Sequence, residues 1–426
     1  MKNTLLFTLF SFYSLTLFSQ GWEQTFGGDD YDVGCHVVQT VDGGYVVLAN
    51  YESSFNGNKI VLIKTDATGN TLWIKSYSGS IGSCYQDNNL QQTTDGGFVI
   101  VGSLWVNGNH DALLIKTDAT GDTLWTKHYN QVIGNQVNSG SVCQANDNGF
   151  VISGILNFVY GGGEAYLMKV NNVGEMDWIK TYPGMGAAQS VVQTTDNEFV
   201  FTTSIESFPA LVKTDVEGEL LWSNTYEGSS FFNSLQQTFD GGFIAVGGKF
   251  MGGDTDDIIM SLVKTNAFGD TLWTRAFGAG NYHEDWANSV RQTIDGGFIV
   301  IGVNFSLTDG YVWLVKTDEL GLTLWSEDYL GNPNGDYGVS VQETMDGGYI
   351  LTGGKADTLY QDRDVFLVKT DSQGNVVPTF EIPVSVVNRK LEKTIGILGR
   401  EVKPTTNSPF IEIYDDGTVE KKVIIE

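Results

Sequence analysis

Ionisable side chains recur at equivalent positions along this chain, so a repeated site is the first chemistry to consider. Seven aspartates stand in a Thr-Xaa-Asp-Gly-Gly-Phe/Tyr turn or a close variant, and a lysine follows each about twenty residues later. A group carried by every repeat indicates framework, because an active site is built where a repeat is broken. We expect each aspartate to bind backbone amides of its own turn. The aspartates are Asp42, Asp95, Asp147, Asp196, Asp240, Asp295 and Asp346, and the lysines are Lys64, Lys116, Lys169, Lys213, Lys264, Lys316 and Lys369.

Other groups of catalytic type are few. The four histidines are His36, His110, His128 and His283, and none has a metal-binding spacing such as His-Glu-Xaa-Xaa-His. No Ser/His/Asp series is readable either. Glycan hydrolysis needs two positioned carboxylates, and the 51 acidic residues leave that chemistry open.

The densest departure from the repeat is the segment 280–286. Asp285 shares its repeat position with Asp32 and Asp336, which indicates a structural role, whereas its neighbours fall outside the pattern. Trp105 and Trp286 lie outside the repeated tryptophan position. They are predicted to be exposed platforms that stack on sugar rings, with partly buried loop anchors as the alternative. The predicted ligand-binding residues are Trp105, His283, Glu284 and Trp286, and no catalytic residue is assigned.

Two acidic loops, 29–32 and 254–257, offer alternate carboxylates, the oxygen ligands that calcium prefers. Neither is a complete EF-type loop. We therefore predict no cofactor and leave calcium binding open.

The repeat also predicts the strands and turns that carry these residues. Its period near fifty residues indicates one repeated supersecondary unit. Each unit reads as a Ser-Val-Xaa-Gln-Thr strand, a hairpin at Asp-Gly, a β-branched and aromatic strand, a strand ending in the lysine, and a fourth strand carrying tryptophan. Four antiparallel strands repeated radially predict an all-β fold, a seven-bladed β-propeller.

The tryptophans predict how the ring closes. The seventh unit has Pro378 where the others have tryptophan, and the missing strand stands at the other end of the body, from Trp22 to Gly27. An N-terminal strand that completes the last blade leaves no open sheet edge. The tryptophans predicted to pack between blades are Trp22, Trp73, Trp125, Trp178, Trp222, Trp273 and Trp325.

This hairpin-plus-tryptophan block resembles the tryptophan-docking motif of quinoprotein-type propellers, in which tryptophan follows glycine by four residues, as Trp73 follows Gly69. The aspartate lies one residue nearer the glycine than in that family. The resemblance therefore implies the architecture and not pyrroloquinoline quinone chemistry.

The net charge limits the classes of partner that the chain can bind, and the cysteine positions limit its disulfides. A net charge of −27 argues against nucleic acid and anionic membrane surfaces, because both attract basic patches. Cys35, Cys84 and Cys143 occupy three different repeat positions, so we expect buried free thiols, with one bridge left open.

The two ends of the chain indicate export. Residues 1–19 combine a basic start, an apolar run and a small residue at the end, which predicts a signal peptide. No later segment offers the roughly twenty apolar residues of a membrane-spanning helix. The propeller is expected at 20–377, a linker with prolines at 378–388 and a small β module at 389–426.

The C-terminal module has apolar stretches at Thr394–Leu398, Phe410–Tyr414 and Val423–Ile425, with an Asp416-Gly417 hairpin turn between the last two. Its Ile-Leu-Gly-Arg run at 397–400 and its Tyr-Asp-Asp-Gly-Thr-Val run at 414–419 resemble the C-terminal sorting domain of type IX secretion substrates of Bacteroidota. The resemblance implies a sandwich-like module that the type IX machinery recognises. It also implies passage across the outer membrane, then release or surface attachment.

These observations predict a monomeric protein, secreted or on the outer cell surface, that acts as a non-catalytic binding or adhesion module. The expected ligand is a polysaccharide or a surface protein. A hydrolase or lyase acting on polysaccharide from a propeller scaffold is the alternative, and quinone-dependent oxidation is the third hypothesis.

Overall fold

In a computed structural model the chain divides into two compact units, Met1–Pro378 and Thr379–Glu426. The predicted signal peptide, the linker 378–388 and His283 lie outside the described residues. Within the first unit the structure describes residues 21–376 apart from 29–30, 53–57, 81–88, 107–108, 130–136, 160–161, 253–256, 279–283, 306–309, 333–334 and 357–361, and within the second it describes 391–396, 402–403, 410–414 and 419–422.

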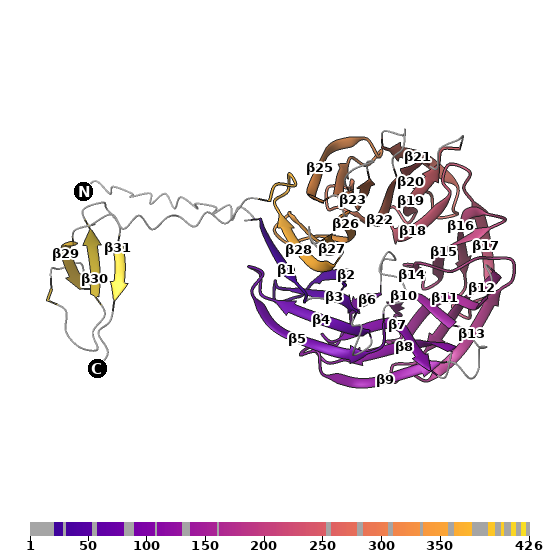
Figure 1. Cartoon of the computed structure of the whole chain (residues 1–426), viewed down its shortest axis with the longest axis horizontal. Coiled ribbons are helices and arrows are strands. Elements are labelled where there is room, and N and C mark those ends of the chain that lie inside the picture. The colour runs from indigo at the N-terminus through magenta and orange to yellow at the C-terminus, as the bar shows by residue number, and fades with distance from the viewer. Residues whose placement is uncertain are drawn as a thin grey trace, which may run out of the picture. The chain divides into compact units, whose positions relative to one another are not determined.

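The first unit is a propeller-like ring of antiparallel sheets (Figure 1). Its described strands form six sheets, five of four strands and one of eight. In chain order the strands are β1 (Trp22–Phe26); β2 (Asp32–Gln39), β3 (Tyr45–Tyr51), β4 (Lys59–Thr65), β5 (Thr71–Ser78); β6 (Leu90–Gln92), β7 (Phe98–Val106), β8 (Asn109–Thr117), β9 (Thr123–Tyr129); β10 (Val137–Gln144), β11 (Phe150–Val159), β12 (Gly162–Val170), β13 (Met176–Tyr182); β14 (Val191–Gln193), β15 (Phe199–Ile205), β16 (Phe208–Thr214), β17 (Leu220–Thr225); β18 (Phe231–Gln237), β19 (Phe243–Phe250), β20 (Ile258–Thr265), β21 (Thr271–Phe277); β22 (Glu284–Gln292), β23 (Phe298–Phe305), β24 (Gly310–Thr317), β25 (Thr323–Asn332); β26 (Tyr337–Glu343), β27 (Tyr349–Ala356) and β28 (Arg363–Thr370).

The eight-stranded sheet contains two antiparallel groups of four, β18–β21 and β22–β25. A single parallel pair, Ile258 with Glu284, joins the two groups. The first strands of neighbouring groups contact one another around a closed circuit, from β2 through β6, β10, β14, β18, β22 and β26 back to β2. These first strands therefore surround the axis of the ring.

The N-terminal strand completes the last sheet. β1 pairs antiparallel with β28, from Trp22 opposite Lys369 to Phe26 opposite Val365, and the sheet order is β1-β28-β27-β26. This confirms the predicted position of the N-terminal strand. Pro378, which occupies the tryptophan position of the last unit, lies outside the described residues.

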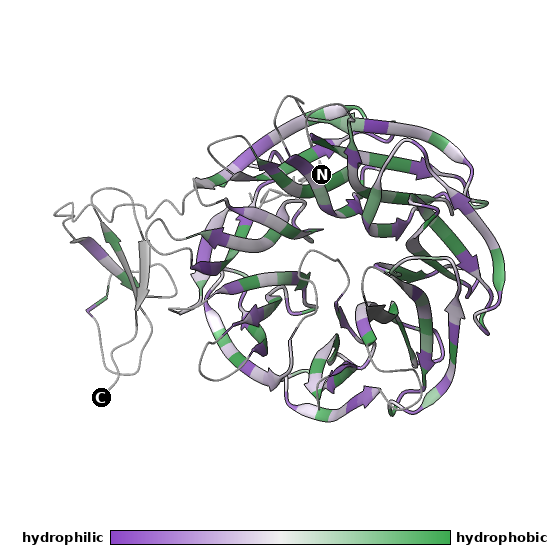
Figure 2. Ribbon diagram, turned by 45° about the vertical axis from the view of Figure 1, so that its right-hand side comes forward, coloured by the Kyte–Doolittle hydropathy of each residue, from purple (hydrophilic) through white to green (hydrophobic). Residues whose placement is uncertain are grey.

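Burial explains which residues form which strands. The second and third strands are β-branched and aromatic and are buried almost throughout, as in β3 and β4, whereas the fourth strands alternate between exposed and half-buried residues, as in β5. Figure 2 shows the hydrophobic colour concentrated in the middle of each sheet. Residue Gly43 in the first hairpin turn has φ = 82°, and Asn148 and Asn197 take the same left-handed conformation in their units.

The second unit contains a three-stranded antiparallel sheet in the order β29 (Leu391–Gly396), β30 (Phe410–Tyr414), β31 (Val419–Lys422). The prediction for β30 was right, and β29 begins three residues earlier than expected. The predicted third stretch, Val423–Ile425, lies outside the described residues. The described third strand, β31, pairs with β30 from Ile413 opposite Val419 to Phe410 opposite Lys422. The sandwich-like arrangement stays a prediction.

Candidate functional site

The repeated lysines and aspartates pair with each other. In every unit the lysine that ends the third strand reaches the aspartate of the first turn, with Nζ–O distances of 2.7–3.0 Å. The lysine side chains are 2–11% exposed and the aspartates 39–61% exposed. In six of the seven turns the aspartate also accepts a hydrogen bond from a backbone amide two residues on, which confirms that part of the prediction.

These contacts set the charge state of the pairs. Burial acts to raise the pKa of Asp95, but hydrogen bonds from Thr93, Lys116 and the Gly97 amide outweigh it and lower that pKa to about 2. The same balance lowers the pKa of Asp196 to about 2. The aspartates are therefore ionised at neutral pH and form ion pairs with their lysines. These pairs stabilise the hairpins of each repeat.

The fourth-strand tryptophans lie against the next group of strands. A side chain added at Gly121 would stand 2.8 Å from the Trp73 ring, and the same closeness holds between Trp325 and Gly374. Trp22 covers Gly69 in the same way, so the N-terminal strand connects the last group to the first. Six of the tryptophans also contact an aromatic ring on the second strand of the neighbouring group at 5.7–6.4 Å between centroids, mostly edge to face.

A glutamine belt joins the first strands around the axis. The Gln144 side chain accepts a hydrogen bond from the Thr94 amide of the preceding turn at 2.9 Å, and Gln292 accepts one from the Phe239 amide at 2.7 Å. In the last group Glu343 takes the glutamine position and accepts from the Ile294 amide at 2.8 Å. Burial raises the pKa of Glu343, and the nearby Asp295 charge adds to the shift.

The structure separates the predicted ligand-binding residues. Trp105 lies on β7, is 62% exposed, and meets only His110 edge to face at 4.6 Å among the described ring contacts. Glu284 and Trp286 lie on β22, in a different sheet, and His283 lies outside the described residues. Trp105 therefore does not share a sheet with Glu284 and Trp286.

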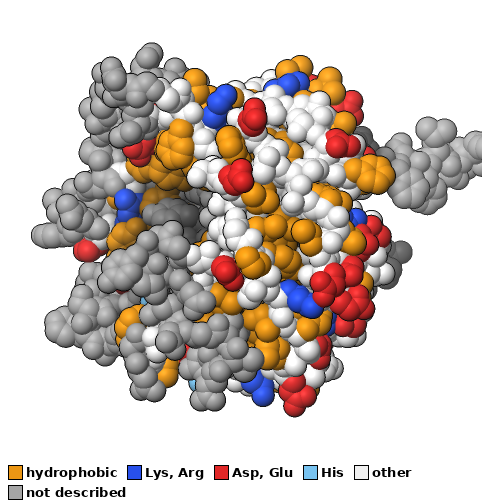
Figure 3. All heavy atoms as spheres, turned by 90° about the vertical axis from the view of Figure 1, so that its right-hand side faces the viewer, with side chains coloured by type: hydrophobic (Ala, Val, Ile, Leu, Met, Phe, Trp, Pro, Cys, Tyr) orange, Lys and Arg blue, Asp and Glu red, His pale blue; other side chains and the backbone are white. Residues whose placement is uncertain are grey.

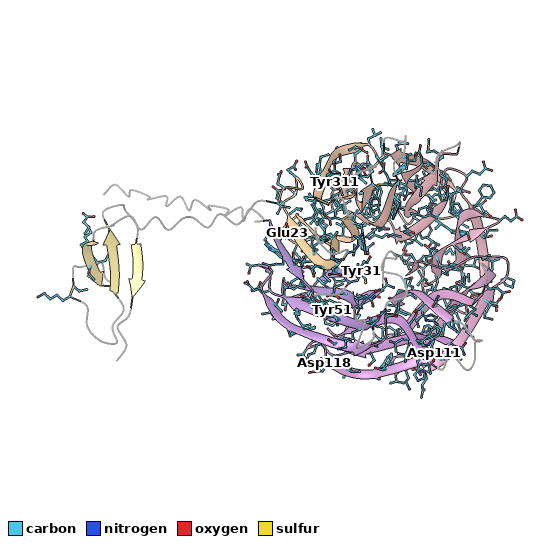
Figure 4. All side chains as sticks on the ribbon, viewed as in Figure 1. Glu23, Tyr31, Tyr51, Asp111, Asp118 and Tyr311 are labelled. Atoms are coloured by element: carbon cyan, nitrogen blue, oxygen red, sulfur yellow. The ribbon has the colours of Figure 1, made fainter. Side chains whose placement is uncertain are left out.

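Trp286 belongs to an aromatic cluster near the axis. Its ring lies 5.7 Å from Phe305, and both pack beside Tyr31 and the buried Tyr337. The hydroxyls of Tyr31 and Tyr337 are 3.0 Å apart, and the Arg363 guanidinium lies over both of these rings. Figure 4 shows Tyr31 beside the central opening of the ring. Trp286 is half-buried here, whereas Glu284 beside it is exposed.

A cavity of about 560 Å³ occupies the axis of the ring. Residues from β2, β6, β10, β14, β22 and β26 line it, together with residues Asn146 and Thr195 of two first turns. It therefore extends along the first strands to the face of the ring that carries those turns. Among the described lining residues no aspartate or glutamate is present, in a chain with a net charge of −27.

Two residues of this cavity break the repeat, and neither was among the predicted site residues. His36 takes a position where five other units have serine, and its Nδ1 lies 3.4 Å from the Ser340 hydroxyl. Arg291 takes a position held elsewhere by Val, Gln or Cys, and it donates to the Val290 carbonyl at 2.7 Å. Comparing first strands position by position, instead of inspecting loops, would have identified both.

The remaining candidate chemistry is limited. Among the described residues no group of three or more His, Cys, Asp or Glu side chains could hold a metal ion. Both acidic loops extend beyond the described residues, so calcium binding stays untested. Cys143 is a buried free thiol as expected, whereas Cys35 is disulfide-bonded, which realises the bridge that the sequence left open.

No protein-family model and no curated protein matches the sequence of this chain. Solved structures do match its fold. A streptogramin B lyase is 10% identical with a TM-score of 0.51, over 82% of this chain and 98% of that one. Virginiamycin B lyase from Staphylococcus aureus is 9% identical with a TM-score of 0.51, over 82% and 99%. A protein of unknown function from Bacteroides caccae is 13% identical with a TM-score of 0.43, over 70% and 94%.

At these identities the likeness establishes the fold alone: this chain has the β-propeller architecture found in those lyases. No helix within the described residues has the length and apolar character needed to cross a membrane.

Proposed function

We propose that this protein is an exported, non-catalytic binding module at the cell surface or in the medium, and that its ligand binds at the axis of the ring. The observation that carries the proposal is the axial cavity, where two repeat-breaking residues, His36 and Arg291, point to a function beyond the framework. Its volume of about 560 Å³ lies within the range typical of small-ligand sites.

The lining supports binding through amide and guanidinium groups. Gln91, Gln144 and Gln342 bring side-chain amides to the cavity, and Arg291 brings a cation. Such groups orient a polar ligand by hydrogen bonds. The repeated ionisable groups do not compete for this role, because each lysine is already paired with its aspartate.

The test is to screen the purified full chain on an array of polysaccharides and a panel of cell-surface proteins. We expect a binding partner whose affinity falls at least tenfold in Arg291→Gln and His36→Ser, which restore the residue types of the other units. Silence of the wild-type chain on both panels would count against the binding function. Turnover of a polysaccharide would instead establish the hydrolase or lyase alternative.

We also propose that export uses the two chain ends. Residues 1–19 supply the signal peptide and residues 389–426 the address read by the type IX secretion machinery, as the sequence resemblance implies. The described β29–β31 sheet is compatible with a small terminal β module. Removal of 389–426 should leave the protein in the periplasm of a type IX-competent host, and unchanged release to the outside would contradict this address.

We further propose that the ring has seven blades. The two halves of the eight-stranded sheet share one residue pair, and each half has its own turn, its own Lys–Asp pair and its own tryptophan. Each half therefore carries the complete repeat. An experimental map of the ring with six or eight radial units would overturn this count.

A further inference from the structure

A second cavity, of about 420 Å³, lies between the third and fourth groups of strands, β10–β13 and β14–β17. Residues of the first turn, β12 and β13 of one group line it, together with β14, β15 and both turns of the next group. Asn146 and Gln193 line this cavity and the axial cavity alike, so the two adjoin. We call it the inter-unit cavity. Its volume lies within the range typical of small-ligand sites.

The repeat is broken at two positions of the inter-unit cavity. Asp177 stands on β13 immediately before Trp178, and Ala145 begins the first turn, where the other six units have threonine. The five other fourth strands that follow a described turn have leucine at the Asp177 position, and these leucines are 49–59% exposed. An exposed leucine is ordinary surface. The aspartate is therefore a departure that faces a cavity. The five leucines are Leu72, Leu124, Leu221, Leu272 and Leu324.

Ala145 leaves the turn aspartate of its unit with spare hydrogen-bonding capacity. In the other six units the threonine hydroxyl donates to the aspartate. Among the described contacts Asp147 accepts only from the Gly149 amide at 2.8 Å and from Lys169 at 2.7 Å. Its side chain is also the most exposed of the seven. A carboxylate has about four acceptor positions, so Asp147 can accept further hydrogen bonds from a ligand.

The cavity holds further acceptors and one free donor group. The Asp177 carboxylate lies 3.5 Å from Lys169 Nζ, and Glu217, in the turn between β16 and β17, is exposed. The Asn197 side chain accepts from Asn146 at 2.5 Å, which leaves its own NH₂ group to donate to a ligand. The lining therefore offers several carboxylate acceptors beside an amide donor.

The charges of the lining favour an uncharged ligand. The carboxylates of Asp147, Asp177 and Glu217 repel an anion, whereas the buried ammonium of Lys169 repels a cation. A neutral ligand that fills these acceptors must bring hydroxyl groups. Trp178 is half-buried and adds its indole to the lining, which suits the C–H face of a sugar ring.

We propose that the inter-unit cavity binds a neutral sugar residue of a glycan. Sugar hydroxyls donate to Asp147 and Asp177, the Asn197 amide donates to a sugar oxygen, and the ring lies against Trp178. A longer glycan continues toward the adjoining axial cavity. The site is additional to the ligand site proposed at the axis and depends on neither of the repeat-breaking residues there.

The experiment is calorimetric titration of the full chain with three neutral hexasaccharides, cellohexaose, mannohexaose and maltohexaose, and with two charged ones, hexagalacturonate and a chitosan hexamer. We expect at least one neutral hexasaccharide to bind, and both charged ones to bind at least tenfold more weakly. Asp177→Leu, which restores the residue of the other units, should weaken the binding at least tenfold. Ala145→Thr, which returns a hydroxyl donor to Asp147, should weaken it at least threefold.

Glu327→Leu is the matched control, because it changes an exposed acid to leucine on β25, the fourth strand of another unit, and should leave the affinity within twofold. Thermal unfolding of each variant establishes that the ring is intact. The proposal is overturned if no neutral hexasaccharide binds, if a charged one binds equally well, or if Asp177→Leu and Ala145→Thr leave the affinity unchanged.

The two proposed sites can fail separately. Loss of sugar binding in Arg291→Gln with full binding in Asp177→Leu would assign the sugar to the axis, so the axial site would stand and the inter-unit site would fall. Binding of a cell-surface protein when no hexasaccharide binds would likewise remove the inter-unit site and keep the binding function.

Discussion

Lys116 shows how a single residue serves this fold. Its ammonium group is buried at the end of β8, donates to the Thr117 carbonyl at 2.8 Å, and depends on a half-exposed carboxylate 2.9 Å away for its counter-charge. An isolated buried ammonium would be costly. The aspartate therefore supplies more than a turn, because it compensates a charge that lies on another strand.

We expect Asp95→Asn to destabilise the protein by about 1–3 kcal/mol at neutral pH, because it removes the charge opposite Lys116 and weakens the turn. The pKa of Asp95 is lowered from 3.8 to about 2, so its contribution is present above pH 4 and is lost as the pH falls toward 2. The difference in unfolding free energy between the two proteins should shrink over that range. Urea unfolding at pH 7 and pH 3 measures it, and a constant difference would contradict the assignment.

Glu343→Gln should have the opposite effect. The pKa of Glu343 is raised above 4.5 by burial and Asp295, so ionisation costs stability as the pH rises through the unfolded value. Glutamine fills the same position in the other units and keeps an oxygen for the Ile294 amide. We expect a gain of about 1 kcal/mol at pH 7 and a smaller gain at pH 4, measured by thermal unfolding. A loss of stability at pH 7 would show that the carboxylate is needed.

At the scale of strands and turns, the hairpins were predictable because their signals are local. Asp-Gly at positions 42–43 predicts a turn whatever surrounds it, and the second strands begin at Tyr45 and Phe98 as expected. Contacts that depend on register were not predictable. The pairing of Lys64 with Asp42, 22 residues apart, requires the alignment of three strands. The inward direction of Arg291 likewise follows from the pleat of β22 and its bulge at Ala287–Ser289.

Two glycines of the last repeat allow the energetic cost of overpacking to be measured apart from the cost of backbone strain. Gly347 and Gly374 both have positive φ, near 80°, but a side chain at Gly347 meets nothing within 4 Å whereas one at Gly374 would stand 2.8 Å from Trp325. We expect Gly347→Ala to cost about 1 kcal/mol. Gly374→Ala should cost about 1–3 kcal/mol more, because it also overpacks the tryptophan contact. Chemical denaturation measures both, and equal losses would contradict the packing role of Trp325.

At the scale of the whole molecule, the closed circuit of first strands surrounds the axial cavity. In the propeller-like ring, exposed leucines lie on the fourth strands, which carry the tryptophans. Figure 3 shows hydrophobic side chains among acidic and basic ones on one outer side of the ring. Scattered single residues of this kind are ordinary surface. The axial cavity differs from this surface because two residues that break the repeat, His36 and Arg291, line it.

Trp22→Ala should test closure directly. The substitution removes the indole that lies over Gly69 and its edge-to-face contact with Tyr45 at 5.7 Å. We therefore expect the free energy of unfolding to fall by about 3–5 kcal/mol. A chain beginning at residue 28 also loses β1 and should expose the edge of β28, with aggregation visible by size-exclusion chromatography. A chain beginning at residue 20 is the matched control. Equal melting temperatures for the 20-start and 28-start chains would disprove the closing role.

The pairing of β1 with β28 also has a consequence in time. β1 is the first described strand of the ring to be synthesised and β28 is the last, so Trp22 cannot pair until Lys369 has been made. Until then the last sheet is one strand short. Such long-range pairing makes folding slow, and an incomplete ring exposes a strand edge. The propeller-like ring is therefore complete only after the whole of residues 22–370 has been synthesised.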